Sequence, residues 1–269
     1  MFNAKNGKIN IDNTDMDYIC FGRGKKQLIM IPGLGDGLKT VKGYAIPFSV
    51  MYKEYAENYR VYLFSRRNKL PKEFSTKEMA SDIAFAMQQL NIERADVLGV
   101  SQGGMIAQYL AIDYPEKVNK LCIAVSISKP NETMTGVVSS WIQMANADDY
   151  KSIFIDTAEK SYSEKYLEKS RWMFSLLSRV GKPKSFNRFI TLANACISHN
   201  CYEELNKIAC PVLVIGGKED KIVTAQASAE IANAIPHSQL YMYDGLGHAA
   251  YEEAKDFNHR VIEFFDKQN

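Results

Sequence analysis

One short stretch, Gly-Val-Ser-Gln-Gly-Gly at residues 99–104, restricts the possible folds of this chain more than any other. Residues 95–100 have the apolar character of a short buried strand, and residues 105–111 have the apolar spacing of a helix. A Gly-x-Ser-x-Gly between a strand and a helix is typical of a nucleophile elbow, a turn that lifts a serine hydroxyl out of a sheet. The turn is so tight that small residues are needed two positions before and after Ser101. A Gly-rich turn that only happens to hold a serine is the alternative.

Apolar runs of strand length recur along the chain and alternate with helical segments. Strands of this kind, covered on both faces by helices, predict a mostly parallel α/β sheet. A probable hairpin occupies 8–21. The other expected strands are 27–31, 59–64, 95–100, 120–125, 211–216 and 239–243, and the expected helices outside the middle of the chain are 46–58, 76–90, 105–111, 225–234 and 251–265.

The alternation stops at about residue 128 and resumes at about residue 207. The segment between is expected to be wholly helical, and it holds both tryptophans of the chain together with other bulky apolar residues. We therefore expect one α/β core domain from 1–127 and 207–269, with 128–206 inserted as a helical cap. Because these helices must pack on something apolar, we expect them to line a substrate pocket. The candidate lining residues are Trp141, Met144, Trp172 and Phe189.

A serine hydroxyl needs a neighbouring base before it can act as a nucleophile, and the base needs an orienting group. The chain has four histidines, so the base can be sought by elimination. His199 lies in the helical insertion, His237 lies in a turn, and His259 lies inside the last helix. His248 instead follows the last strand, at the carboxyl edge of the sheet where active sites of open α/β folds assemble. His248 is therefore the candidate base.

Asp220 is the candidate acid, because its loop also follows an apolar strand at that edge. The chain order Ser101, Asp220, His248 is the order expected for a nucleophile elbow. Glu219 is the neighbouring alternative, and an Asx-type turn is the alternative role for Asp220 itself. An oxyanion hole needs two backbone N–H groups, which we expect from Leu34 in the Gly-rich loop and from Gln102 at a helix N-terminus.

Composition excludes several classes of partner. Lys plus Arg number 33 and Asp plus Glu number 31, which leaves a formal charge of +2 and no basic stripe for nucleic acid. The first residues lack the apolar core of a signal peptide. No apolar run approaches the roughly 18 residues that span a bilayer. Five cysteines without metal-type spacing fit reduced thiols, no bound metal and a cytoplasmic location.

These motifs together resemble the α/β-hydrolase superfamily over nearly the whole chain. The resemblance rests on the loop at 32–35, the elbow at 99–104, the Asp220 loop and Gly247-His248. It implies a mostly parallel sheet of about eight strands, helices on both faces, an inserted helical cap and no cofactor or metal. The chain departs from the family at Pro32, where a histidine often supports the loop, and at 65–69, where the usual Asp-x-Arg-Gly-x-Gly is Ser-Arg-Arg-Asn-Lys.

A serine at the elbow, rather than an aspartate, indicates acyl transfer, so the resemblance implies a carboxylesterase acting on small or medium substrates. A C–C bond hydrolase or an enol-lactonase with the same triad is the first alternative. Such enzymes often bind a substrate carboxylate, for which Arg171, Arg179 and Arg188 of the insertion are candidates, although solvated helix faces explain them more simply. A ligand-binding receptor of the same fold is the second alternative, which has no need of an intact Ser, His and Asp.

Overall fold

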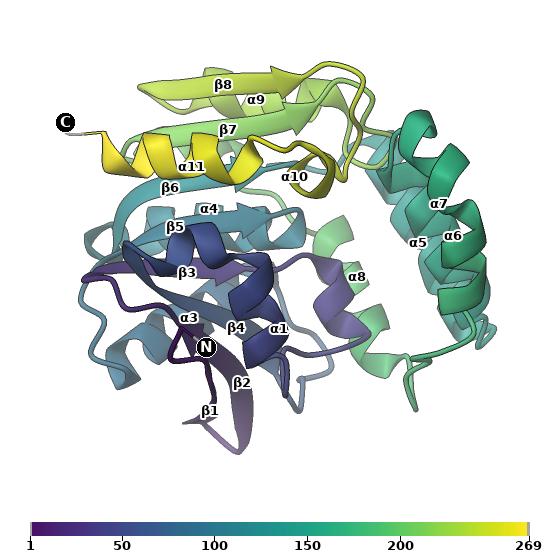
Figure 1. The fold of residues 1–269 in the computed structure, drawn as a ribbon, viewed down its shortest axis with the longest axis horizontal. Coiled ribbons are helices and arrows are strands. Elements are labelled where there is room, and N and C mark those ends of the chain that lie inside the picture. The colour runs from purple at the N-terminus through teal and green to yellow at the C-terminus, as the bar shows by residue number, and fades with distance from the viewer. Residues whose placement is uncertain (1, 268–269) are drawn as a thin grey trace.

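The structure is a computed structural model that describes residues 2–267. In this part of the chain an eight-stranded sheet crosses the molecule in the order β1-β2-β4-β3-β5-β6-β7-β8 (Figure 1). β2 runs antiparallel to both of its neighbours, and the pairs from β4 to β8 are parallel. The mostly parallel sheet is therefore confirmed. The strands are β1 Lys5–Ile11, β2 Thr14–Phe21, β3 Lys26–Ile31, β4 Tyr59–Arg67, β5 Ala95–Val100, β6 Val118–Ala124, β7 Val212–Gly217 and β8 Ser238–Tyr243.

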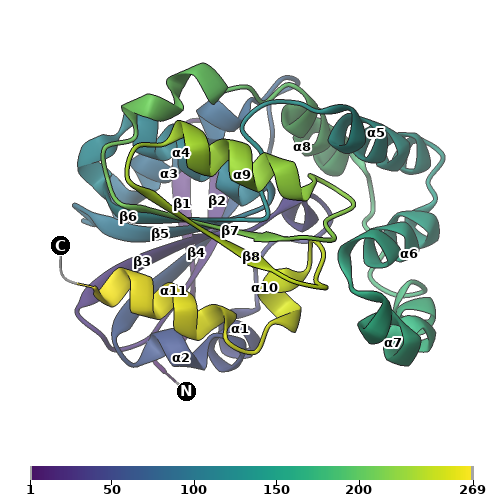
Figure 2. The same cartoon turned by 90° about the horizontal axis from the view of Figure 1, so that it is seen from above.

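Helices cover both faces of the sheet, which explains why its central strands are mostly apolar (Figure 2). One face carries α3 Thr76–Gln89, α4 Gln102–Asp113 and α9 Ala225–Ala234. The other carries α1 Ala45–Met51, α2 Lys53–Ala56 and α11 Phe257–Asp266, with α10 Ala250–Glu253 at its end. Short segments of 3₁₀ helix occur at η1 Leu34–Gly37, η2 Pro115–Lys117 and η3 Tyr202–Lys207.

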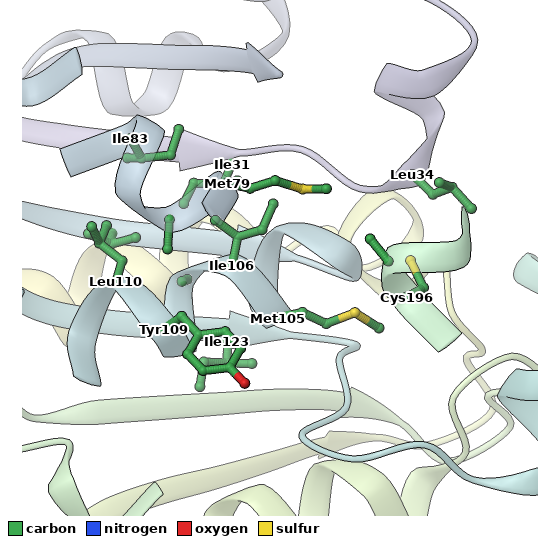
Figure 3. Close-up of a cluster of buried hydrophobic side chains, with 14 of the residues drawn as sticks. Ile31, Leu34, Met79, Ile83, Met105, Ile106, Tyr109, Leu110, Ile123 and Cys196 are labelled. Atoms are coloured by element: carbon green, nitrogen blue, oxygen red, sulfur yellow. The ribbon is translucent and has the colours of Figure 1, made fainter. Parts of the chain in front are cut away.

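The core on the α3 and α4 face holds the elbow in place. Ser75 caps α3 in a reciprocal capping box with Glu78, which fixes where this helix begins. α4 is buried along almost its whole length, since α3 covers it on one side and the sheet on the other. Figure 3 shows this core from Ile83 of α3, across α4, to Leu34 and Cys196 near the carboxyl edge of the sheet.

Two expected helices are each broken in the structure. The segment 46–58 divides into α1 and α2 at Tyr52, whose φ of −106° and ψ of 32° are not helical. The break lets α2 bury Tyr55 completely, whereas α1 leaves Met51 exposed. The segment 251–265 divides at 254–256, so that α11 packs its own apolar stripe on the sheet. The expectation of single helices was wrong because tertiary packing reorients each half.

Four helices lie between β6 and β7, beyond the carboxyl ends of the parallel strands (Figure 1). They are α5 Glu132–Asn146, α6 Tyr150–Ser161, α7 Glu164–Leu177 and α8 Asn187–Ile197. α5 and α8 share one apolar core with the sheet: Met134 and Leu192 are buried in the same cluster as Met105 of α4. We propose the domain division at 128–206 on this connectivity, with an insertion that packs as part of the main core.

Candidate functional site

The candidate nucleophile lies at the turn between β5 and α4. Ser101 has φ 55° and ψ −120°, which is strained for a residue with a side chain. Its backbone N–H donates to the Ala124 carbonyl at 2.9 Å, which fastens the turn to β6. A Cβ at Gly103 would lie 1.9 Å from the Ile31 carbonyl oxygen, and one at Gly99 would lie 2.4 Å from that of Gly103. Both positions therefore need glycine.

His248 and Asp220 lie beside this turn, on the loops that follow β8 and β7. His248 Nε2 is 3.0 Å from Ser101 Oγ, and His248 Nδ1 is 2.8 Å from Asp220 Oδ2. The Asp220 and His248 side chains are only 2% and 9% exposed. The structure thus brings the three residues selected from the sequence into one hydrogen-bonded chain.

The surroundings of Asp220 favour its ionised form. Burial acts to raise its pKa, but the charge and hydrogen bond of His248 act against it. Two backbone N–H groups, from Val223 at 2.9 Å and Ile222 at 2.8 Å, donate to Oδ1 and add to the opposing effect. The net result is an Asp220 pKa below the ordinary value of 3.8. A negative carboxylate at this point can hold the Nδ1 proton of His248 and stabilise an imidazolium.

The other candidates for base and acid lie elsewhere. His199 is buried, with Nδ1 2.8 Å from Thr76 Oγ1, and burial lowers its pKa to about 3. His237 and His259 are exposed, in the turn before β8 and on α11. Glu219 is exposed, whereas its neighbour Asp220 turns inward. None of these four side chains has a hydrogen bond to Ser101 or His248 among residues 2–267.

The two proposed oxyanion donors come from segments that flank the elbow. Gln102 is the first residue of α4, and Leu34 is the first residue of η1. Neither of their backbone N–H groups donates a hydrogen bond within the described part of the chain. Gly33 brings the loop close to the serine, because a Cβ at this position would lie 3.3 Å from Ser101 Cβ. Two free N–H donors near a serine hydroxyl can stabilise an oxyanion.

A buried arginine links these two segments and was not singled out as a site residue. Arg66 Nη2 donates to the Pro32 carbonyl at 2.6 Å and to Gln102 Oε1 at 3.1 Å. Gln102 Nε2 in turn donates to the Leu192 carbonyl of α8 at 2.7 Å. Burial lowers the pKa of Arg66 to about 10. The histidine support that Pro32 lacks is thus replaced by an arginine that holds the loop carbonyl itself.

An ion pair fixes the other end of the oxyanion loop to the insertion. Arg188 of α8 donates from Nη2 to Asp36 Oδ2 at 2.6 Å and from Nε to the Asp36 carbonyl at 3.1 Å. Asp36 Oδ2 also accepts the Arg66 backbone N–H at 3.0 Å. The sequence signal that could have found this pair is Asp36 itself, an acid inside a Gly-rich loop beside the site.

A cavity of about 540 Å³ opens at Ser101 and His248. Trp141 is among its lining residues. The expectation for the other three lining candidates was wrong. Phe189 is buried against Gly37 of η1, Met144 packs half-buried against the core, and Trp172 is 71% exposed on α7. The helical pattern of the insertion marked apolar faces, but it did not tell which face meets the cavity.

None of the three candidate arginines lines this cavity. Arg171 pairs with Glu159 and Glu164 on the exposed side of the insertion, and Arg188 is engaged by Asp36. Arg179 is exposed after the end of α7. Among residues 2–267 there is no group of three or more histidine, cysteine, aspartate or glutamate side chains that could hold a metal ion. The same residues contain no helix that is both long and apolar enough to cross a membrane.

Comparison with known proteins supports the fold described above. A sequence model of the family described as alpha/beta hydrolase fold matches residues 27–255. The chain is 25% identical to 3-oxoadipate enol-lactonase 2 of Acinetobacter baylyi over 184 residues. This matched region covers 68% of each chain. It is 24% identical over 272 residues to a 2-hydroxy-6-oxononadienedioate/2-hydroxy-6-oxononatrienedioate hydrolase of Pseudomonas sp, covering 96% of this chain and 92% of that one. The enol-lactonase structure from Burkholderia xenovorans LB400 superposes with a TM-score of 0.83 at 18% identity, covering 97% and 100% of the two chains.

Proposed function

We propose that this chain, which belongs to the α/β-hydrolase family, is a serine hydrolase that cleaves carboxylic esters through an acyl-enzyme on Ser101. The observation that carries the proposal is the continuous hydrogen-bonded chain from Ser101 Oγ through His248 to Asp220, at the wall of an apolar cavity. A serine with a neutral imidazole as base and a carboxylate behind it is the arrangement that acyl transfer requires.

In the proposed reaction, Ser101 Oγ attacks the ester carbonyl while His248 Nε2 accepts its proton. Asp220 holds Nδ1–H and stabilises the imidazolium that forms. The carbonyl oxygen becomes negative and binds the N–H groups of Leu34 and Gln102. The imidazolium then gives its proton to the leaving alcohol, and an acyl-enzyme remains. Water then attacks the acyl carbon while His248 accepts its proton. As the bond from the acyl carbon to Ser101 Oγ breaks, the imidazolium returns this proton to Ser101 Oγ and the acid is released.

The direct test replaces Ser101 by alanine and measures hydrolysis of simple aryl esters. Loss of the nucleophile is expected to lower kcat by about 10⁶, while the thermal unfolding temperature stays close to that of the parent. Ser163→Ala is a matched control, because Ser163 caps α7 far from the elbow in sequence and is not among the residues that line the cavity. Unchanged turnover by Ser101→Ala would disprove the assignment of this residue.

Hydrolysis of an enol-lactone or of a C–C bond is the second candidate function. The sequence relatives named above favour it, since one is an enol-lactonase and the other is a hydrolase of oxo-dienedioates. The same three residues would act, with a lactone carbonyl or a ketone in the place of the ester. A panel of aryl esters, lactones and vinylogous diketones separates the candidates by relative kcat/KM. A lactone preferred over every ester by more than tenfold would favour the second candidate.

Covalent labelling distinguishes a serine hydrolase from a ligand-binding protein of the same fold. A fluorophosphonate is expected to modify Ser101 and to add one phosphonyl group per chain by mass spectrometry. The reaction requires an activated serine, whereas a receptor pocket without nucleophilic activation gives no adduct. An unlabelled parent protein that still binds small apolar ligands would favour the receptor.

A further inference from the structure

We propose that the cavity binds an uncharged ester with an apolar group on each side of its carbonyl, held in two arms that lie on opposite faces of the sheet. This inference rests on the proposed function and adds the substrate class. The insertion arm is lined by Met105, Met134, Val138, Trp141, Cys196 and Val223. The α1 arm is lined by Met30, Phe48, Tyr52, Leu63, Leu98 and Val100.

The two arms follow from the alternation of side chains along a strand. Consecutive residues of β3 point to opposite faces, so Ile31 belongs to the core shared with the insertion and Met30 to the core under α1 and α11. Both nevertheless line the same cavity. The cavity therefore continues around the carboxyl edge of the sheet. Ser101 stands at this edge, at the end of β5 in the middle of the sheet, where the two arms meet.

The charges around the cavity argue against an anionic substrate. Lys39 is the only cationic side chain among its lining residues in the described chain; it is exposed, with Nζ 4.6 Å from the centroid of the Tyr44 ring. Two carboxylates also lie in the lining: Asp36, which Arg188 already pairs, and the exposed Glu252. A substrate carboxylate inside either arm would lose its hydration without gaining a cationic partner, which is unfavourable.

The size of the cavity fits a substrate that fills both arms. Its volume of about 540 Å³ lies within the usual range for ligand pockets. Each methylene that an arm removes from water is expected to raise kcat/KM by about fourfold until the arm is full. The gain should occur on either side of the carbonyl, because apolar side chains line both arms. An ester of acetic acid and methanol leaves both arms without an apolar occupant.

The first experiment compares two series of esters by pH-indicator assay: methyl esters of straight-chain acids and straight-chain alkyl acetates. We expect kcat/KM to rise with chain length in both series. Val138→Phe enlarges a side chain in the insertion arm, and Leu63→Phe is its match in the α1 arm. Each variant is expected to lower kcat/KM for the long esters of one series by at least tenfold. For the other series, kcat/KM should stay within about twofold of the parent value. The affected series identifies which arm holds the acyl group.

The second experiment tests charge with one carbon skeleton. The dimethyl ester of a six-carbon diacid should be hydrolysed at least tenfold more efficiently than its monomethyl ester, whose free end is a carboxylate. Rates are measured at low and high salt, because high salt would screen any attraction between Lys39 and the carboxylate of the monomethyl ester. A monomethyl ester that equals or exceeds the dimethyl ester overturns the uncharged substrate class.

The outcomes separate this inference from the proposed function. Fluorophosphonate labelling and thermal unfolding of both phenylalanine variants show that Ser101 remains reactive and the fold intact. Esters that are hydrolysed without dependence on chain length, or variants that lower both series equally, overturn the two arms but leave the nucleophile assigned. A parent protein that neither hydrolyses esters nor becomes labelled overturns the proposed function and this inference together.

Discussion

At the scale of single residues, Asp220 combines two roles that the sequence presented as alternatives. Its Oδ1 accepts the N–H groups of Ile222 and Val223, as in an Asx-type turn, and its Oδ2 accepts from His248. The turn fixes the carboxylate so that its second oxygen meets the imidazole. The Asx-type turn therefore orients the Asp220 carboxylate toward His248, so the turn and the contact with His248 are compatible roles of one side chain.

Replacement of Asp220 tests this double role against the neighbouring carboxylate. Asp220→Asn keeps the size of the side chain but removes the charge that holds the His248 tautomer, so kcat for ester hydrolysis is expected to fall by about 10⁴. Glu219→Gln is the matched control and should change kcat by less than twofold, because that side chain is exposed. Steady-state kinetics of both variants decide between them. A larger loss in Glu219→Gln would contradict the assignment.

The positions of Asp220 and His248 beside Ser101 could be predicted from sequence, because each residue follows an apolar strand and parallel strands place such loops at one edge. Arg66 could not be predicted in this way. An arginine near the end of a strand is most often solvated, yet Arg66 is buried and donates hydrogen bonds to both Pro32 and Gln102. Its role depends on contacts between residues distant in the chain, for which a single sequence carries no local signal.

At the scale of elements, α8 contacts the loop beside Ser101 directly, although it is part of the insertion. It lies against η1, and its Arg188 reaches Asp36 of that turn and the carbonyls of Arg66 and Arg67. The side chains of Asp36 and Arg188 are 1% and 17% exposed, so the pair is shielded from water. The sequence predicted that the whole segment 128–206 is helical, without dividing it into separate helices. It could not predict that Phe189 would face Gly37 instead of the cavity, because helical periodicity does not name the surface that a helix covers.

Two arginine variants of the insertion are expected to differ sharply in stability. Arg188→Met leaves the buried Asp36 carboxylate without its partner, which should lower the free energy of unfolding by about 3 kcal/mol. Arg171→Met breaks an exposed pair with Glu159 and Glu164 and should lower the free energy of unfolding much less, because solvent screens this pair. Urea denaturation followed by circular dichroism measures both. Equal losses would show that the Arg188 pair does not behave as a buried one.

At the scale of the whole molecule, local signals predicted the sheet and its covering helices well. Apolar runs, short loops and the position of the insertion can each be recognised from residues that are close in sequence. These features were sufficient to predict the mostly parallel sheet. The breaks at Tyr52 and at 254–256, and a cavity that passes from one face of the sheet to the other, arise only when distant segments meet. The substrate preference is therefore the property of the whole molecule that the sequence constrains least.

His199 joins separate parts of the molecule and should make its stability depend on pH. Its ring lies between Thr76 of α3 and Cys201, with the Tyr109 ring of α4 packed edge-on at 5.4 Å. Burial lowers its pKa in the folded protein to about 3, below the value of 6.5 expected in the unfolded chain. On acidification the unfolded chain therefore binds the proton first. The stability that the neutral ring contributes is complete above pH 6.5 and decreases as the pH falls toward 3.

Between pH 8 and pH 5 this effect should remove about 2 kcal/mol from the free energy of unfolding. His199→Gln retains polar atoms at the site, but glutamine does not bind a proton in this pH range. Between pH 8 and pH 5 the variant should therefore lose about 2 kcal/mol less stability than the parent. Urea denaturation of both proteins at each pH measures the difference. Parallel stability curves for the two proteins would show that His199 becomes protonated without unfolding.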